Sequence, residues 1–172
     1  MTSLTPALSQ QDPTAVLPGE PDARVLLVGS SGGHLAQLLA LHAYWANLTR
    51  AWVTFDTPDA KDKLSGESDV TWAHWPTTRN LPNLARNTTL AAGVVARFRP
   101  TVVVSTGAAV ALPFFVMGKK AGATTVFIEV NDRVETPTLS GRLCRPVTDL
   151  MLVQWPEQAR LYRDAVVIGP LL

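Results

Sequence analysis

The chain alternates short runs of apolar, often β-branched residues with longer segments in which apolar residues recur at helical spacing. The apolar runs predict seven strands, at residues 24–28, 51–55, 70–75, 101–105, 124–128, 150–154 and 166–168. Most of these runs are apolar on both faces, as in a sheet that helices cover on both sides. Strands that alternate with helices form βαβ units with right-handed crossovers. The pattern therefore predicts an α/β fold with a doubly wound, mainly parallel Rossmann-like sheet.

Three of the intervening segments carry clear helix signals. Residues 35–47 place four leucines at helical spacing, and residues 83–99 are followed by a proline, which cannot continue a helix. Thr57 and Pro58 form an N-cap followed by proline at the first helical position, which predicts a short helix through Lys63.

Length and composition restrict the class of protein. The 172 residues, 47% of them hydrophobic, suit one domain with a sizeable core and leave little room for a second. A formal net charge of +1 argues against a protein that binds nucleic acid. Residues 1–22 are rich in proline and are expected to form a disordered tail, so that residues 23–172 make up the domain. The longest strongly apolar stretch, 108–117, is too short to cross a bilayer as a helix.

A glycine-rich turn, GSSGG at residues 29–33, follows the first predicted strand. In an open α/β sheet this turn lies at the carboxyl edge, where ligands bind. Glycines let the backbone approach a ligand closely, and the free N–H groups of a helix start attract an anion such as a diphosphate. The alternative is that these glycines only make a tight turn.

The glycine spacing separates this turn from two common phosphate-binding loops. A dinucleotide fingerprint reads G-x-G-x-x-G, whereas this turn reads G-x-x-G-G, and no G-K-[ST] follows as in a Walker loop. Asp56 ends the second predicted strand and could imitate the acid that binds an NAD ribose. A nucleotide-dependent oxidoreductase therefore stays open as a weaker alternative.

His34 follows the glycines at the N-terminus of the first predicted helix, where the positive end of the helix dipole disfavours the imidazolium form. A neutral imidazole can take the proton that a sugar hydroxyl loses as it attacks an anomeric carbon, and such a base contributes about 10² to 10⁴ in rate. The alternative is that His34 only orients a phosphate or caps the loop.

Six short runs lie in one order along the predicted strand ends: GSSGGHL at 29–35, TFDTPDA at 54–60, PTTRN at 76–80, STGA at 105–108, IEVNDR at 128–133 and VQWPEQ at 153–158. Together they resemble the Alg14/PssD family of oligosaccharide and polysaccharide biosynthesis proteins. Members of that family are similar to the N-terminal lobe of GT-B glycosyltransferases such as MurG. The resemblance implies one lobe of a split enzyme, with the nucleotide-sugar lobe on a separate, small donor-binding subunit of the Alg13/PssE type.

The resemblance also implies roles for residues at the carboxyl edge. His34 would lie in or beside the catalytic centre, and Glu129 would either share in catalysis or order its loop by hydrogen bonds to backbone N–H groups. The acceptor's diphosphate would be bound by Ser30, Ser31, Gly32, Gly33, Thr106, Gly107, Asn131 and Arg133. Arg133 could instead pair with Asp132 or Glu135 at the surface. Without a D-x-D motif, we predict no metal ion and no cofactor in this lobe.

The implied function is that of the acceptor-binding subunit of a two-subunit glycosyltransferase. The enzyme would transfer a sugar from a UDP-sugar, with GlcNAc or glucuronate as the sugar, to a polyprenyl-diphosphate-linked saccharide in polysaccharide biosynthesis. The alternative is a non-catalytic subunit that recruits the partner. A lipid-linked acceptor requires contact with the membrane surface, so we expect a cytoplasmic protein, peripheral at the cytoplasmic face. The apolar chain end, Gly169, Pro170, Leu171 and Leu172, is expected to dock the donor subunit unless it packs only on its own domain.

Overall fold

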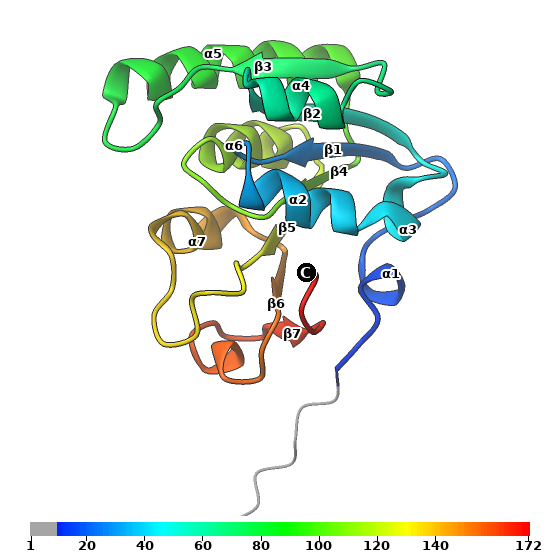
Figure 1. Cartoon of the computed structure of the whole chain (residues 1–172), viewed down its shortest axis with the longest axis vertical. Helices are drawn as coiled ribbons and strands as arrows, with labels where there is room; N and C mark the ends of the chain where they lie inside the picture. Colours follow the sequence, from blue (N-terminus) through cyan, green and yellow to red (C-terminus); the bar gives the residue numbers. More distant parts are fainter. Residues whose placement is uncertain (1–9) are drawn as a thin grey trace, which may run out of the picture.

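Seven strands form one sheet in the order β3-β2-β1-β4-β5-β6-β7, and every neighbouring pair is parallel. The computed structural model describes residues 10–172 (Figure 1). The strands are β1 (Arg24–Val28), β2 (Thr49–Phe55), β3 (Val70–Ala73), β4 (Val102–Ser105), β5 (Thr124–Ile128), β6 (Leu150–Val153) and β7 (Val166–Val167). This topology confirms the predicted doubly wound parallel sheet, and the strand order reverses between β1 and β4.

Helices cover both faces of the sheet. The helices are α1 (Pro13–Val16), α2 (Gly33–Ala40), α3 (His42–Trp45), α4 (Pro58–Lys63), α5 (Leu81–Phe98), α6 (Ala111–Lys120) and α7 (Leu139–Cys144), with short 3₁₀ turns η1 (Arg145–Val147) and η2 (Gln158–Arg160). Buried residues of α2, α3 and α4 pack on one face, and those of α5, α6 and α7 pack on the other. Within residues 10–172, no helix is both long and apolar enough to cross a membrane.

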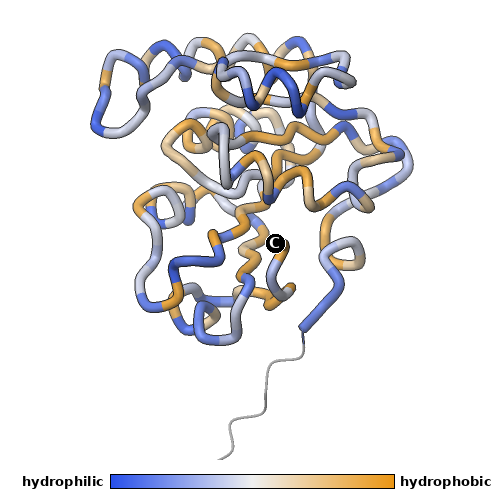
Figure 2. The backbone as a smooth tube through the Cα atoms, in the orientation of Figure 1, coloured by the Kyte–Doolittle hydropathy of each residue, from blue (hydrophilic) through white to orange (hydrophobic). Residues whose placement is uncertain are grey.

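The core has two halves, one on each side of the sheet. In β1, Leu26 and Val28 join the half beneath α5 and α6, whereas Val25 and Leu27 join the half beneath α2 and α3. This alternation follows from the two-residue period of a strand, and burying each such side chain contributes roughly 1.5–3 kcal/mol. Figure 2 shows the central strands as the most continuously hydrophobic part of the tube.

The segment predicted as one helix at 35–47 forms two helices, α2 and α3, separated at Leu41. The indole Nε1 of Trp45 donates a hydrogen bond of 2.9 Å to the carbonyl of Leu38. In a continuous helix that carbonyl would accept from the N–H of residue 42. Burial of Trp45 against the sheet therefore outweighs the helical periodicity of the leucines.

Three α-helices were not predicted: α1, which lies in the predicted tail, α6 and α7. The apolar run at 108–117 contains Pro113, which argues against a helix interior. In α6, however, Pro113 lies in the first turn, where backbone N–H groups have no intrahelical partner. The proline therefore costs α6 no hydrogen bond.

Part of the segment predicted as a disordered tail belongs to the folded domain. Residues 1–9 lie outside the described residues, but residues 10–22 pack against the half of the core beneath α3. Leu17 is buried, and the Tyr44 hydroxyl donates a hydrogen bond of 2.7 Å to the carbonyl of Pro18. One apolar side chain and one buried tyrosine thus hold a segment whose composition predicts disorder.

Candidate functional site

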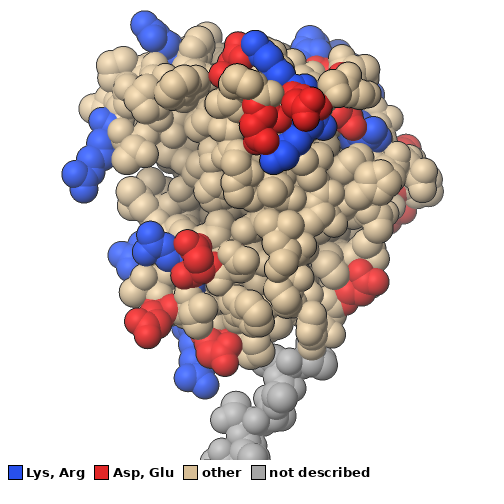
Figure 3. All heavy atoms as spheres, viewed as in Figure 1, with Lys and Arg blue, Asp and Glu red and all other residues tan. Residues whose placement is uncertain are grey.

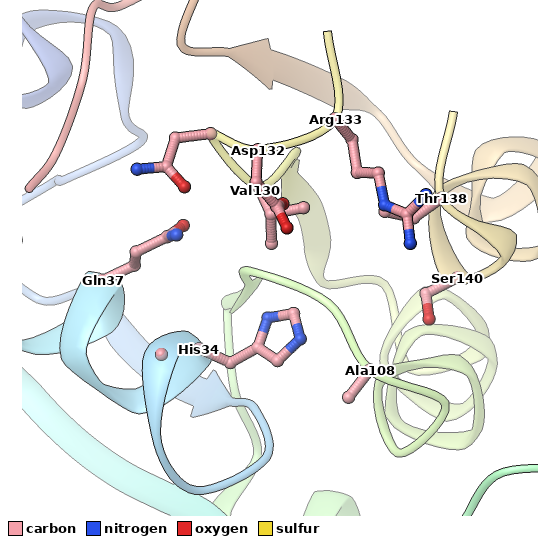
Figure 4. Close-up of a pocket in the computed structure, with 10 residues that line it drawn as sticks. His34, Gln37, Ala108, Val130, Asp132, Arg133, Thr138 and Ser140 are labelled. Carbon is pink, nitrogen blue, oxygen red and sulfur yellow. The ribbon is translucent and has the colours of Figure 1, made fainter. Parts of the chain in front are cut away.

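Loops at the carboxyl edge of the sheet enclose a polar cavity of about 420 Å³ beside the start of α2 (Figure 4). Its lining residues are Gly33, His34, Gln37, Ala108, Val130, Asn131, Asp132, Arg133, Thr138 and Ser140. They come from α2, from the loops that follow β4 and β5, and from the start of α7. The cavity lies where the strand order reverses, which is where open α/β sheets bind ligands.

Of the residues that the sequence predicted for this site, the cavity brings four together: Gly33, His34, Asn131 and Arg133. Thr106 and Gly107 lie behind His34 and hold its ring rather than line the cavity. The turn that leads into α2 contains Ser30, Ser31 and Gly32, and none of these residues lines the cavity. Gln37, Asp132 and Ser140 are lining residues that the sequence did not single out.

The turn before α2 leaves backbone N–H groups free. Gly32 is the N-cap of α2 and has no side chain to accept a hydrogen bond from the first turn. Its φ of +77° lies in the left-handed region, which glycine adopts without strain. The open N–H groups and the positive end of the α2 dipole make this helix start suited to an anion.

The imidazole of His34 has a defined tautomer. Its Nδ1 lies 2.8 Å from the carbonyl oxygen of Thr106, and because a carbonyl only accepts, Nδ1 must carry the hydrogen. Nε2 is then left with a lone pair. Figure 4 shows the ring of His34 extending into the space that Ala108, Arg133 and Ser140 surround.

Burial lowers the pKa of His34 below its ordinary value of 6.5. The bond to Thr106 and the negative charges of Glu129 and Asp132 act in the opposite direction but do not reverse the shift. At neutral pH the ring is therefore uncharged. A neutral ring with a free Nε2 can accept a proton from a ligand hydroxyl.

Residues of the STGA run fix His34 in this position. The hydroxyl of Thr106 donates a hydrogen bond of 2.9 Å to the backbone carbonyl of His34, so the two residues bind each other reciprocally. Gly107 has a φ of +117°, and a Cβ there would lie 3.0 Å from Cε1 of His34. The glycine in this run is therefore required by the close approach of the imidazole.

The carboxylate of Glu129 is fully buried and does not line the cavity. Its Oε1 accepts from the N–H of Val130 at 3.0 Å, and its Oε2 accepts from the N–H and the hydroxyl of Thr138 at 3.2 Å each. The hydroxyl of Tyr162 donates to the same Oε2. These bonds tie together the two ends of the loop at 130–138, so the geometry favours the ordering role of Glu129 over a catalytic one.

The backbone of this loop is held by the VQWPEQ run at 153–158. Nε2 of Gln158 donates to the carbonyls of Val130 at 2.7 Å and Arg133 at 3.1 Å. The indole Nε1 of Trp155 donates to the carbonyl of Asn131 at 2.9 Å. With the backbone fixed by these bonds, the side chains of the loop remain available to a ligand.

Gln154 connects the cavity to the end of the chain. Its Nε2 donates to the carbonyl of Glu129 at 2.9 Å and to Oε1 of Gln37 at 3.1 Å, and its Oε1 accepts from the N–H of Leu171 at 2.9 Å. Sequence reasoning assigned no role to Gln154 or Gln158. The available signal was a pair of glutamines four residues apart at the end of a buried strand, where a polar side chain needs a partner.

Replacing Glu129 by glutamine is expected to lower the free energy of unfolding by about 1–3 kcal/mol. The reason is that the NH₂ group of the amide cannot accept the hydrogen bonds that the second carboxylate oxygen accepts. Well below the melting temperature, the sugar transfer that the resemblance to the Alg14/PssD family implies should fall by less than about tenfold, since a positioning residue does not itself transfer the proton. Urea unfolding and initial rates across pH test this. A catalytic role would instead give unchanged stability, a rate loss above a hundredfold and an altered pH profile.

Comparison with known proteins agrees with the fold. The family model described as "Oligosaccharide biosynthesis protein Alg14 like" matches residues 76–171. The UDP-N-acetylglucosamine transferase subunit ALG14 of Mus musculus is 25% identical over 191 residues, which cover 93% of this chain and 88% of that protein. The human subunit of the same name is 23% identical over 180 residues, with 86% and 82% covered.

Among solved structures, MurG of Acinetobacter baumannii superposes with a TM-score of 0.70 at 15% identity, over 84% of this chain and 45% of that one. UDP-N-acetylglucosamine 2-epimerase of Rickettsia bellii superposes with a TM-score of 0.67 at 10% identity, over 87% and 45%. This chain thus spans less than half the length of either solved protein, and the likeness concerns the fold. Because the family model covers more than half of the chain, the protein belongs to the Alg14-like family of oligosaccharide biosynthesis proteins.

Proposed function

We propose that this chain is the acceptor-binding subunit of a two-subunit glycosyltransferase, which transfers a sugar from a UDP-sugar to a polyprenyl-diphosphate-linked saccharide. The observation that carries the proposal is the neutral His34, with Nε2 free, between the uncapped start of α2 and the loop that carries Arg133. The family match and the transferase names of the mammalian relatives support it.

The cavity has separate groups for binding and for proton transfer. The acceptor's diphosphate would lie against the free N–H groups of α2, with the guanidinium of Arg133 adding positive charge. The acceptor hydroxyl would lie against Nε2 of His34. As the hydroxyl oxygen bonds to the anomeric carbon of the donor sugar, its proton passes to Nε2, and the bond from that carbon to UDP breaks with its electrons leaving on UDP.

The donor site would belong to a separate subunit of the Alg13/PssE type, since the mammalian relatives are by name subunits of a transferase, which implies a second chain. N-acetylglucosamine is the favoured donor sugar, because the mammalian relatives are UDP-N-acetylglucosamine transferase subunits by name, and glucuronate is the second candidate. A lipid-linked acceptor would bring the pair to the cytoplasmic face of the membrane. Asp56 pairs with Lys61 at 2.7 Å, so the oxidoreductase alternative receives no support from a free carboxylate there.

We further propose that the chain end docks the donor subunit. Leu171 is partly buried and tied to Gln154, whereas Leu172 is 65% exposed. Replacing Leu172 by aspartate should weaken partner binding by about tenfold or more, because burying a leucine contributes roughly 1.5–3 kcal/mol. Titration of the labelled partner tests this.

Trp75 provides the matched control for the chain end. It is 58% exposed and follows β3, at the sheet edge opposite to β7. Trp75→Ser should leave partner affinity unchanged. Unchanged affinity in Leu172→Asp, or in a chain that lacks residues 169–172, would contradict the docking role.

Transfer of radiolabelled sugar from a panel of UDP-sugars to a polyprenyl-diphosphate-sugar acceptor tests the proposed function. The assay is run with this chain alone, with the partner alone and with both. We expect product only from the pair, with UDP-N-acetylglucosamine as the preferred donor. Product from this chain alone would place a donor site on it and refute the split.

A further inference from the structure

A second cavity, of about 190 Å³, lies next to the polar one, between the start of α5, the start of α6 and α7. Five leucines contribute to its wall: Leu81, Leu84, Leu112, Leu139 and Leu143. Nothing in the function proposed so far uses this apolar space.

Three of these leucines are exposed to solvent. Leu81 is 75% exposed, Leu139 69% and Leu143 48%. Within residues 10–172, only five large hydrophobic side chains are exposed, and these leucines are three of them. Leucines that gather at the rim of an apolar cavity, rather than being scattered singly, indicate a binding surface. Figure 3 shows a hollow between the loop before α5 and the region of α7, where most atoms belong to uncharged residues and charged side chains lie at the rim.

Two of the five polar side chains that line this cavity, Asn87 and Asn80, are engaged in hydrogen bonds. Both ends of the Asn87 amide bond the backbone of His74, at 2.9 Å each, and Oδ1 of Asn80 accepts from the N–H of Asn83 at 3.0 Å. The other three are Thr77, Arg79 and Ser140, and the rest of the wall is leucine and alanine. A polar ligand would therefore lose most of its bonds to water against this wall, whereas a hydrocarbon has none to lose. The chemistry of the wall selects an apolar occupant.

The apolar cavity adjoins the polar one. Ala108 and Ser140 line both, so only two small side chains lie where a ligand anchored in the first cavity would enter the second. A molecule that fits both must join an anionic or polar group to a hydrocarbon chain within a short distance. A polyprenyl diphosphate has this order of groups.

We infer that the leucine-lined cavity holds the isoprene unit of the acceptor nearest its diphosphate; this inference rests on the proposed function. An apolar cavity of about 150 Å³ is large enough to bind benzene, so about 190 Å³ accommodates a branched five-carbon unit. The first isoprene unit then acts as a recognition element for the acceptor. The exposed rim leucines guide the rest of the chain out of the protein.

The test uses two water-soluble acceptors with the same diphosphate-saccharide, one carrying a chain of two isoprene units and one a methyl group. Transfer by the complex with the partner is measured without membrane or detergent. We expect the acceptor KM to be about tenfold lower for the isoprenyl compound, because burial of several carbon atoms is favourable. In the double variant Leu139→Asn/Leu143→Asn, this ratio should fall towards one while KM for the methyl compound stays unchanged.

The double variant Leu139→Met/Leu143→Met is the matched control and should keep the preference, since it preserves the apolar surface. An unchanged ratio in the asparagine variant would overturn the inference. So would a variant that keeps the ratio but loses binding to phospholipid vesicles, because the leucines would then contact the bilayer instead. If the wild-type complex transferred sugar to neither compound, the proposed function would fail. Calorimetry of the two compounds with this chain would then still test the cavity: tighter binding of the isoprenyl compound would support the inference, and equal binding would overturn it.

Discussion

Replacing His34 by alanine is expected to lower the rate of sugar transfer by the reconstituted enzyme by about 10² to 10⁴, the usual contribution of a positioned general base. The reason is that Nε2 is the free proton acceptor in the cavity, its tautomer being fixed by the bond from Nδ1 to Thr106. Initial rates at saturating donor and acceptor measure the effect. Partner binding should stay unchanged, because His34 lies at the start of α2 and not at the chain end.

His34→Asn provides the matched control for this prediction. The asparagine amide can still donate a hydrogen bond towards the carbonyl of Thr106, but it cannot accept a proton at neutral pH. We therefore expect the asparagine variant to be as slow as the alanine variant. Recovery of most of the rate in His34→Asn would show that the histidine only holds the loop, and loss of acceptor binding without loss of kcat would support the recruiting alternative.

The pH dependence of the wild-type enzyme gives a second view of the same group. Only neutral His34 can act as a base, and burial lowers its pKa below 6.5. On the acid side, the pH at which the rate is half its maximum should therefore lie below 6.5, as the ring becomes protonated. A half-maximal rate at a pH above 6.5 would contradict the lowered pKa of His34.

Replacing Gly141 by alanine is the second large effect that we expect, and it concerns stability. A Cβ at this position would overlap the hydroxyl of Tyr162 and would lie 2.7 Å from Oε2 of Glu129. Because the buried carboxylate holds the loop at 130–138, relief of the overlap must break bonds that organise the site. Overpacking of this kind lowers the free energy of unfolding by about 1–3 kcal/mol, and by more when hydrogen bonds are lost as well.

Urea unfolding measures the effect of Gly141→Ala, and Gly93→Ala is its control. Gly93 lies in α5 with nothing within 4 Å of a Cβ, so alanine there should raise the free energy of unfolding by about 0.5–1 kcal/mol. The two substitutions add the same methyl group to a helix with opposite expected signs. Equal effects would mean that the cluster around Glu129 can rearrange without cost.

The sheet could be predicted from the sequence because its strands are nearly continuous apolar runs. The predicted strand at 24–28 has the same bounds as β1, and Thr57 caps α4 as the N-cap pattern indicates. The predictions were less accurate where a tertiary contact decides. Trp45 packs against the sheet and bonds the carbonyl of Leu38, which interrupts the helix at Leu41. Leu17 folds part of the predicted tail onto a core built from residues distant in the sequence.

The site could be predicted only as far as local geometry determines it. The position of His34 after a glycine turn predicted its location at the start of α2 and a neutral ring. In the structure burial lowers its pKa, and the bond from Nδ1 to Thr106 fixes the tautomer rather than the charge. The burial of Glu129 could not be foreseen, because Tyr162 lies 33 residues further along the chain. The roles of Gln154 and Gln158 could not be predicted either, because both side chains bond backbone carbonyls of a segment distant in the sequence.

The central claim is that the cavity beside His34 binds the acceptor's diphosphate-saccharide and not the nucleotide sugar. Equilibrium binding to this chain alone, by calorimetry with a soluble short-chain isoprenyl-diphosphate-saccharide and with UDP-N-acetylglucosamine, tests it most directly. The account predicts binding of the isoprenyl compound, weakened in Arg133→Ala, and no binding of the UDP-sugar. Binding of the UDP-sugar to this chain, with loss of that binding in Arg133→Ala, would contradict the account.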